Sequence, residues 1–334
     1  MILEWKFLKF LEKIIDKIKE NLNYILLAVV AILVCVLAVM MFSKKNVYNI
    51  NTGNSPVLKK NYVVTHYDNK IFMYKNENLI LKQDYDDKKP YYFDGKFLYL
   101  IDKKDLLQYN TKGKMNSKLS FKSDISYIFA NKDHIIVDTQ NEFSIVNNMK
   151  ILESFDMKDE VSSLIASDKS NYAFSTIGKR DGRIFSKIYM YDEKGLFYKN
   201  IFIDKPIFRM KYVDDKLIVV FDGYIKVFDK AKITKSKSFD GTKDVGISDK
   251  NVYVITKTGE LLIYDKDLKL VSQSKIDDSL KIYSNDKNCI LYNQNGYFMF
   301  EDSKLVEYKA SDLKSITGED DFYLVFNNRI ERIR

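Results

Sequence analysis

The sequence predicts an all-β protein, a β-propeller of eight four-stranded blades (seven is the alternative), preceded by an amphipathic helix and one transmembrane helix. Three observations support this prediction. A strand-like run rich in Val, Ile, Tyr and Phe recurs eight times, at intervals of 33 to 45 residues. From residue 60 on, turn-forming clusters of Asp, Asn, Gly and Lys separate these runs, and no segment keeps helical spacing. The first 45 residues contain instead a long uncharged run.

The N-terminal segment 1–23 is expected to lie on a membrane surface as a basic amphipathic helix. In WKFLKFLEKIIDKIKENL the apolar residues recur at helical spacing, whereas five lysines occupy other positions. Trp5, the only tryptophan of the chain, stands at its start. A basic amphipathic helix with one tryptophan is typical of the interface of an anionic lipid membrane. The alternative is a core helix of a globular domain, but the sequence offers it no partner helix.

The segment 24–42, YILLAVVAILVCVLAVMMF, is expected to be an uncleaved transmembrane signal anchor. Its 19 residues contain no charge, proline or glycine. As a helix they would span about 28 Å, close to the ~30 Å hydrocarbon thickness of a bilayer. Tyr24 and Phe42 stand at its two ends, where aromatic side chains are typical of the membrane interface, as is Trp5. A cleaved signal peptide is the alternative, but the run is too long and no A-x-A site precedes the lysines.

The lysines beside the span indicate its orientation. Five precede it, and four follow within twenty residues, namely Lys44, Lys45, Lys59 and Lys60. This small excess, together with the affinity of a basic helix for the anionic cytoplasmic leaflet, favours a cytoplasmic N-terminus. The chain is therefore expected to be a single-pass protein of the cell membrane, with its propeller outside the cytoplasm.

Small residues within the span form a candidate helix-dimer face. Ala28, Ala31, Cys35 and Ala38 are spaced three, four and three residues apart, so they lie along one stripe of a helix. Small residues at this spacing let two helices approach closely in lipid. A weak homodimer through this stripe is the hypothesis. The alternative is that alanines are simply common in membrane anchors.

The eightfold repeat carries the propeller prediction. Its most recognisable run appears as YVVTHY at 62, FLYLID at 97, HIIVDT at 134, YAFSTI at 172, LIVVFD at 217, VYVITK at 252, CILYNQ at 289 and FYLVFN at 322. Each run follows an Asp- or Asn-rich turn and precedes a second strand that ends in such a turn. A period near 36 residues built from short strands is typical of propeller blades. A β-sandwich would show alternating strands without a fixed period.

The two ends of the repeat indicate how the ring closes. The chain stops soon after the run at 322, so the last blade lacks one outer strand. The segment VYNI at 47–50 could supply that strand. We therefore assign residues 43–59 to a linker with a ring-closing strand and residues 60–334 to the propeller.

The stretch GELLIYDKDLKLVSQSKI, residues 259–276, resembles PQQ-type and WD40-like repeats, which combine a glycine, an apolar strand, an Asp turn and a further strand. Over residues 60–334 the chain resembles the membrane-anchored, PQQ-like propeller proteins of Gram-positive bacteria that are catalogued as a domain of unknown function. PQQ repeats usually end in a tryptophan, and none follows Trp5. The resemblance therefore implies no quinone cofactor and no catalytic residue.

Residues that commonly bind metals or perform catalysis are sparse. His66 and His134 lie in different blades, and the acidic clusters lack the spacing of a calcium loop. Cys289, within a strand, is expected to be a buried, inert thiol. No catalytic or phosphate-binding motif occurs, so we predict no cofactor, no metal site and no enzyme activity. Charges of both signs are interspersed along the chain, which argues against a nucleic-acid partner.

One insertion is a candidate partner loop. The longest interval between runs contains TIGKRDGRIFSK at 176–187, between the second and third strands of the fourth blade. Lys179, Arg180, Asp181 and Arg183 make it basic, and function is often found on loops. A plain long hairpin is the alternative.

The sequence thus favours a non-enzymatic scaffold that is tethered to the membrane and docks an envelope protein or peptide. A ligand-sensing or carbohydrate-binding propeller is the alternative from another class. An enzyme is the least favoured of the three.

Overall fold

The computed structural model of the chain describes residues 12–13, 47–131, 134–139, 142–156, 160–168, 171–192, 197–230, 232–301 and 304–333. The chain divides into two units, Met1–Lys45 and Asn46–Arg334. In the first unit only Glu12 and Lys13 are described, and both are helical. Within the described ranges, no helix has the length and apolar character needed to cross a membrane.

Most predictions for the first unit lie outside the described residues. This holds for the transmembrane span 24–42 and for the surface helix 1–23 apart from its two described residues. It also holds for the interface residues Trp5, Tyr24 and Phe42 and for the dimer face Ala28, Ala31, Cys35 and Ala38. These assignments stay predictions.

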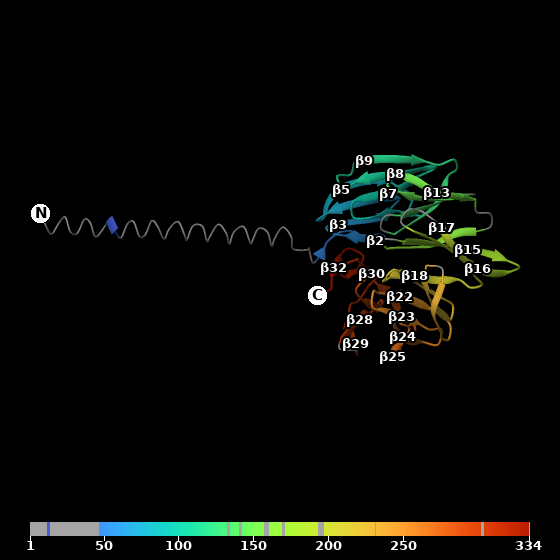
Figure 1. Cartoon of the computed structure of the whole chain (residues 1–334). Coiled ribbons are helices and arrows are strands. Elements are labelled where there is room, and N and C mark those ends of the chain that lie inside the picture. The colour runs from blue at the N-terminus through green and yellow to red at the C-terminus, as the bar shows by residue number, and fades with distance from the viewer. Residues whose placement is uncertain are drawn as a thin grey trace. The chain divides into compact units, whose positions relative to one another are not determined.

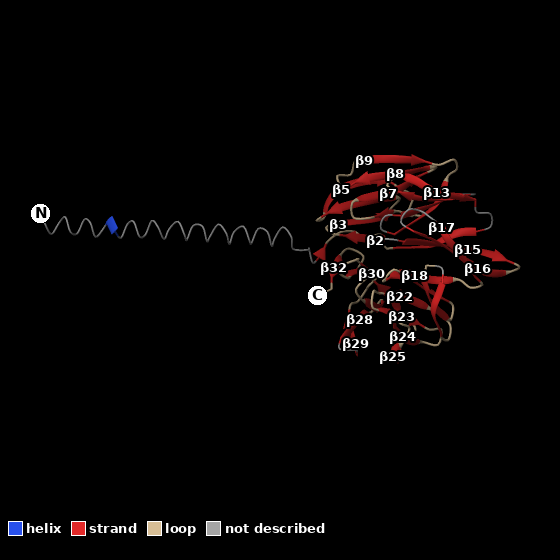
Figure 2. Ribbon diagram, in the orientation of Figure 1, coloured by secondary structure: helices blue, strands red, loops and turns tan. Residues whose placement is uncertain are grey.

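The second unit is an all-β propeller (Figures 1 and 2). Its described residues form eight antiparallel sheets of four strands each, which confirms the predicted blade number and excludes seven. Within each blade we letter the strands A to D from the central channel outwards. At most of the junctions between neighbouring blades, the two A strands contact each other around the channel.

Blades 1 to 4 follow the chain order without exception. Their strands are β2 (Asn54–Lys59), β3 (Tyr62–Tyr67), β4 (Lys70–Lys75) and β5 (Asn78–Asp84) in blade 1; β6 (Tyr92–Phe93), β7 (Phe97–Asp102), β8 (Asp105–Asn110) and β9 (Met115–Ser120) in blade 2; β10 (Ile125–Asn131), β11 (His134–Thr139), β12 (Glu142–Asn147) and β13 (Lys150–Asp156) in blade 3; and β14 (Glu160–Ser167), β15 (Asn171–Arg180), β16 (Arg183–Asp192) and β17 (Phe197–Ile203) in blade 4.

Blades 5 to 7 repeat this order, and blade 8 joins the two ends of the unit. Their strands are β18 (Ile207–Val213), β19 (Lys216–Phe221), β20 (Tyr224–Asp229) and β21 (Lys232–Ser238) in blade 5; β22 (Asp244–Ile247), β23 (Asn251–Ile255), β24 (Glu260–Asp265) and β25 (Leu270–Lys275) in blade 6; β26 (Lys281–Ser284), β27 (Cys289–Asn293), β28 (Gly296–Glu301) and β29 (Lys304–Lys309) in blade 7; and β30 (Ser315–Thr317), β31 (Tyr323–Val325), β32 (Ile330–Arg332) and β1 (Val47–Tyr48) in blade 8.

The B strands are apolar on both faces because a neighbouring blade covers each face. In β23, Val252 and Val254 pack in one cluster with residues of blade 5 such as Val220. Tyr253 and Ile255, which point the other way, pack in a second cluster with residues of blade 7. Side chains alternate between the two faces of a strand. The near-continuous apolar runs of the repeat are therefore what a strand between two blades requires.

The Asp- and Asn-rich turns form as the sequence predicted. The Oδ1 atom of Asp94 accepts hydrogen bonds from the backbone N–H groups of Lys96 and Phe97, at 2.6 Å each. Asn285 accepts the equivalent pair of backbone bonds in blade 7. Such side chains satisfy the turn's own backbone donors and fix the hairpin between the A and B strands.

The ring closes through a very short strand. In β1, Val47 pairs with Glu331 of β32, and Tyr48 pairs with Ile330. These two residues belong to the segment 47–50 that we expected to close the ring. Just beyond, the Thr52 hydroxyl donates to the carbonyl of Phe326 at 2.5 Å. Blade 1 then begins with β2, inside the range 43–59 that the sequence analysis assigned to a linker.

Tyr48 anchors this closure. It is fully buried, in a cluster with Ile50, Leu58 and Val63 and with Tyr323 and Ile330 of blade 8. Its ring centroid lies 6.4 Å from that of Tyr323.

We expect Tyr48→Ala to lower the free energy of unfolding by roughly 3–5 kcal/mol, because removing a buried aromatic ring leaves a cavity that neighbours fill only in part. Val47→Ala is the matched control on the same strand. Its side chain is 37% exposed, so a loss below about 1 kcal/mol is expected. Urea denaturation followed by far-UV circular dichroism measures both. Equal losses would show that β1 is not anchored through Tyr48.

Candidate interaction site

The antiparallel order of strands sorts the turns onto two rims of the propeller. One rim, called the A–B rim, carries the A–B and C–D turns. The other, called the B–C rim, carries the B–C turns and the connections from each blade to the next. The chain enters the propeller at β1, a D strand that runs towards the B–C rim. Features of the B–C rim therefore lie away from the entry point of the chain.

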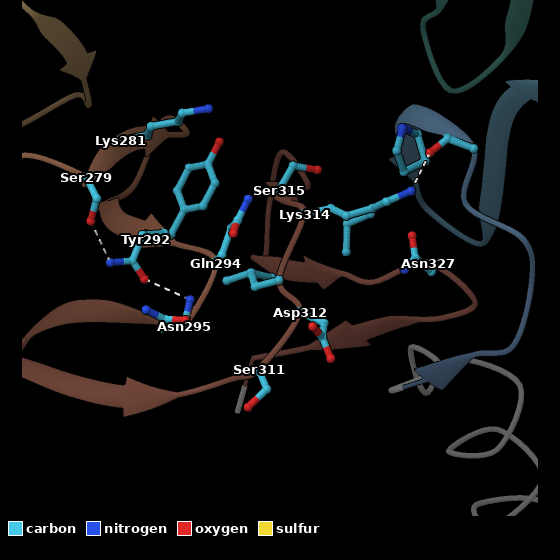
Figure 3. A pocket seen from close by; sticks show the side chains of 15 residues that line it. Ser279, Lys281, Tyr292, Gln294, Asn295, Ser311, Asp312, Lys314, Ser315 and Asn327 are labelled. Atoms are coloured by element: carbon cyan, nitrogen blue, oxygen red, sulfur yellow. Dashed lines mark hydrogen bonds between the residues drawn. The ribbon is translucent and has the colours of Figure 1, made fainter.

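Blade 8 is too short to fill its sector of the ring, and this leaves a groove on the B–C rim. Its strands have only three, three, three and two residues. The inner half of the groove, about 950 Å³, reaches from the B–C turn of blade 7 across blade 8 to β2 of blade 1. Hydroxyl, amide and charged side chains line much of it (Figure 3): Ser279, Lys281, Asn293, Gln294, Asn295, Ser311, Asp312, Lys314, Ser315 and Asn327.

Hydrogen bonds hold part of this lining in place. The Asn293 side-chain amide donates to the Ser279 hydroxyl at 3.0 Å, and its oxygen accepts the backbone N–H of Asn295 at 2.9 Å. Lys314 Nζ donates to the carbonyl of Gly53 at 3.3 Å, which links blade 8 to the connection before blade 1 (Figure 3).

Other lining groups keep their hydrogen-bonding capacity. In the part of the chain that the structure describes, no protein group bonds the side chains of Lys281 and Gln294. Both are exposed at the groove beside the ring of Tyr292 (Figure 3). An ammonium group, a carboxamide and a phenol at one site can donate to and accept from a polar ligand.

The outer half of the groove is aromatic. It continues from Ser311, Asp312 and Asn327, which border both halves, and runs between blades 7 and 8 to the circumference. Because β1 has only two residues, blade 8 covers β28 and β29 only in part, and Tyr297 and Tyr308 are half-buried there. Tyr297 and Tyr308 stack with centroids 5.0 Å apart and planes at 9°.

Charged side chains of blade 8 border the aromatic half. The guanidinium carbon of Arg329 lies 4.0 Å from the centroid of the Phe326 ring, and its Nε atom lies 2.5 Å from Glu331 Oε1. We call the two halves together the seam groove.

The predicted partner loop lies on the same rim, on the blade opposite in the ring. β15 and β16 form a hairpin whose last pair is Arg180 with Arg183. Asp181 and Gly182 both adopt positive φ at the turn, as an Asp-Gly hairpin turn requires. The hairpin extends past its neighbours, since β14 ends its pairing at Gly178. We call residues 178–185 the blade-4 finger.

The four predicted loop residues all lie on this finger. The side chains of Arg180 and Asp181 are 79% and 94% exposed and approach each other only to 4.0 Å. Lys179 and Arg183 are exposed as well. The structure thus gathers these residues at one tip, far from the seam groove, and does not combine the two surfaces into one site.

Ion pairs lie at the A–B rim, at the opposite mouth of the channel. Lys211 of blade 5 lies 2.8 Å from both Asp249 of blade 6 and Asp286 of blade 7. These contacts connect three blades at the A–B rim. The A strands also carry register irregularities in blades 3, 4 and 5, and such bulges disrupt strand pairing along an exposed edge. The channel wall is thus poorly suited to binding an added strand.

Carboxylates near the B–C rim stay ionised at neutral pH. A hydrogen bond from Lys257 and the backbone N–H of Thr242 hold the pKa of Asp222 below its usual range. Bonds from the Ser279 hydroxyl and backbone lower the pKa of Asp277 beside the groove. These two carboxylates therefore do not act as proton donors near neutral pH.

The two histidines pack against tyrosine rings, and the cysteine is buried. His66 lies edge-on to Tyr91 with centroids 5.2 Å apart, and His134 stacks on Tyr172 at 4.2 Å, in blades 1 and 3. Among the described residues, no three metal-binding side chains converge. Cys289 is 4% exposed, and burial raises the pKa of its thiol. The expectation of a buried thiol at this position is confirmed.

Comparisons with known proteins show the fold. No protein family and no curated protein matches the sequence. The structure is similar to BamB from Moraxella catarrhalis, with a TM-score of 0.60, 11% identity, and coverage of 87% of this chain and 98% of that one. It is also similar to Sqt1 from Saccharomyces cerevisiae, with a TM-score of 0.59, 12% identity, and coverage of 87% and 97%. These likenesses show a β-propeller fold.

The seam groove was not predicted from the sequence. The signal was present in the last blade, where the segments LKSITG and NRIERIR on either side of the run at 322 are short. A blade with such short strands leaves part of the facing strands of its neighbours exposed. That consequence becomes visible only once the blade is placed beside β28 and β29.

Gly53 lets the chain turn at the inner end of the groove. It has a φ of +52°, and a Cβ there would lie 2.3 Å from the backbone carbonyl oxygen of His66. We expect Gly53→Ala to lower the free energy of unfolding by more than about 2 kcal/mol, because backbone must move as well as adopt a strained φ. Gly182→Ala, with a φ of +79° in open space, should cost only about 1 kcal/mol. Thermal denaturation compares the two variants. Equal shifts in melting temperature would contradict the expected clash with the His66 carbonyl oxygen.

Burial should make Cys289 unreactive in the folded protein, since only an exposed thiolate reacts readily. In a Cys35→Ser chain at pH 8, we expect Ellman's reagent to modify Cys289 only after urea unfolds the propeller. Fast modification of the native protein would show that blade 7 opens at this position.

Proposed function

We propose that the protein is a non-enzymatic, membrane-tethered scaffold of the cell envelope, which docks a protein or peptide on its B–C rim. It would belong with the membrane-anchored propellers of Gram-positive bacteria that its sequence resembles. The seam groove is the observation that carries this proposal. Its inner half presents donors and acceptors, and its outer half presents stacked tyrosines.

The chemistry of the groove suits an extended polypeptide. A peptide backbone offers one donor and one acceptor per residue, which carboxamides such as Gln294 and Asn327 can match. The tyrosine pair and Phe326 offer apolar surface to a side chain farther along the same peptide, in the outer half of the groove. Aromatic residues and arginine are enriched in the core of protein interfaces. Binding by shape and hydrogen bonds, rather than a reaction, is what this lining favours.

The proposed anchor gives the groove its place in the cell. If residues 24–42 span the membrane with the N-terminus in the cytoplasm, the propeller faces the envelope. The chain enters the propeller through a D strand that runs towards the B–C rim. The groove would then be exposed to proteins of the envelope.

A carbohydrate is the second candidate ligand. Tyr292, whose ring lies beside Lys281 and Gln294 (Figure 3), could stack on a sugar, and the surrounding amides and hydroxyls could bond its hydroxyl groups. This would make the protein a ligand-sensing or carbohydrate-binding module instead of a scaffold.

Site-specific photocrosslinking in intact cells tests the proposal. A benzoyl-phenylalanine at Gln294 is expected to give one discrete protein adduct. Tyr292→Ala with Asn327→Ala should lower its yield about tenfold, as loss of interface anchors does. The matched control places the photocrosslinker at Lys250, an exposed residue of the A–B rim. Similar adducts from both positions, or none from Gln294, would contradict docking at the groove.

The nature of the adduct separates the two candidates. Sensitivity to protease supports the scaffold, whereas sensitivity only to glycan-degrading enzymes supports the carbohydrate module.

Protease added to intact protoplasts tests the orientation. Digestion of the propeller is expected, and protection until lysis would place it in the cytoplasm.

A further inference from the structure

The blade-4 finger carries exposed apolar side chains on both faces. Antiparallel partners share a face, so Ile184, paired with Lys179, lies on one face and Phe185, paired with Gly178, on the other. Ile184 is 49% exposed. Phe185 stacks on Phe202 of β17 with centroids 5.2 Å apart, and Phe202 is 57% exposed. Large apolar side chains seldom gather on an exposed hairpin without a binding role.

The apolar surface continues into blade 4. Val161 of β14 pairs with Ile177 and is 56% exposed. Because Ile177 and Lys179 are two residues apart on one strand, Val161 lies on the same face as Ile184. The finger and its base thus carry three exposed apolar side chains of the described chain, namely Val161, Ile184 and Phe202.

The charge of the finger is positive and largely unneutralised. Lys179, Arg180 and Arg183 stand against Asp181 alone, which is 4.0 Å from Arg180. At the base, Lys187 is already paired with Glu160. Arginine beside exposed aromatic and aliphatic side chains is the composition of a protein interface rather than of a solvated turn.

We propose that the blade-4 finger docks an acidic protein segment that also carries apolar side chains. The apolar groups anchor the segment, and the basic tip orients it by charge complementarity. The exposed aromatic and aliphatic side chains beside the arginines favour a protein over lipid. The finger lies on the B–C rim, opposite blade 8 in a ring of eight, and Figure 1 shows the β15–β16 hairpin projecting on the side away from β32. The finger is therefore far from the point where the chain enters the propeller.

This inference extends the proposed function by a second contact surface and can fail independently of it. The test uses the full chain in phosphatidylcholine nanodiscs. The probe is a fluorescein-labelled twelve-residue peptide in which Glu alternates with Val, and the comparison peptide alternates Glu with Ser. Fluorescence anisotropy measures the dissociation constants.

We expect the Glu-Val peptide to bind at least about tenfold more tightly than the Glu-Ser peptide, since apolar anchors carry most of the binding energy of an interface. Arg180→Ser with Arg183→Ser should weaken binding of the Glu-Val peptide about tenfold. This factor should fall as the salt concentration rises, because salt screens the charges. Ile184→Ser with Phe202→Ser should weaken binding by a similar factor. Far-UV circular dichroism and melting temperature confirm that each variant is folded.

Lys232→Ser with Lys237→Ser, on exposed positions of β21, is the matched control and should leave binding unchanged. Gln294→Ala with Tyr292→Ala alters the seam groove and leaves the finger intact. This variant should also leave binding of the Glu-Val peptide unchanged. Equal weakening by the control pair, or equal binding of the two peptides, would overturn the proposal. So would tighter binding of phosphatidylglycerol vesicles than of the Glu-Val peptide through the same arginines, because lipid would then be the occupant.

Discussion

The pairing of β1 with β32 is the constraint on which the propeller depends. A ring of blades buries its apolar B and C strands only if the last blade meets the first. Here that contact consists of two register pairs, Val47 with Glu331 and Tyr48 with Ile330. Tyr48 and the Thr52 hydroxyl, both buried, reinforce it. The same short strand joins the propeller to the segment that we expect to be a membrane anchor.

The brevity of the closing blade is also what creates a binding surface. Strands of two or three residues close the ring but cover Tyr297 and Tyr308 of blade 7 only in part. The uncovered sector becomes the seam groove, with amides towards the channel and aromatic rings towards the circumference. At the A–B rim, by contrast, Lys211 ties three blades together through Asp249 and Asp286. The seam groove thus opens on the B–C rim, and these ion pairs connect blades at the A–B rim.

The fold could be predicted from the sequence because every blade repeats the same local solution. The apolar run around Val252 and Val254 is a B strand covered on both faces. In blade 2, the side chain of Asp94 accepts backbone hydrogen bonds and fixes the A–B hairpin. The blade-4 finger was visible in the sequence as an interruption of the repeat period. The seam groove was not, because it arises from what blade 8 lacks beside β28 and β29. Periodicity records strands that are present, whereas a groove depends on how neighbouring strands of unequal length pack.

The most direct test of this account is a disulfide across the closing pair. In a full chain with Cys35→Ser, Val47→Cys combined with Glu331→Cys should oxidise rapidly to an intramolecular bond, because these residues are direct partners in the sheet. The cyclised chain should migrate differently on a non-reducing gel. Val47→Cys combined with Lys250→Cys, on blade 6, should not crosslink within the molecule. Absence of the first crosslink, or equal formation of the second, would show that β1 does not close the ring.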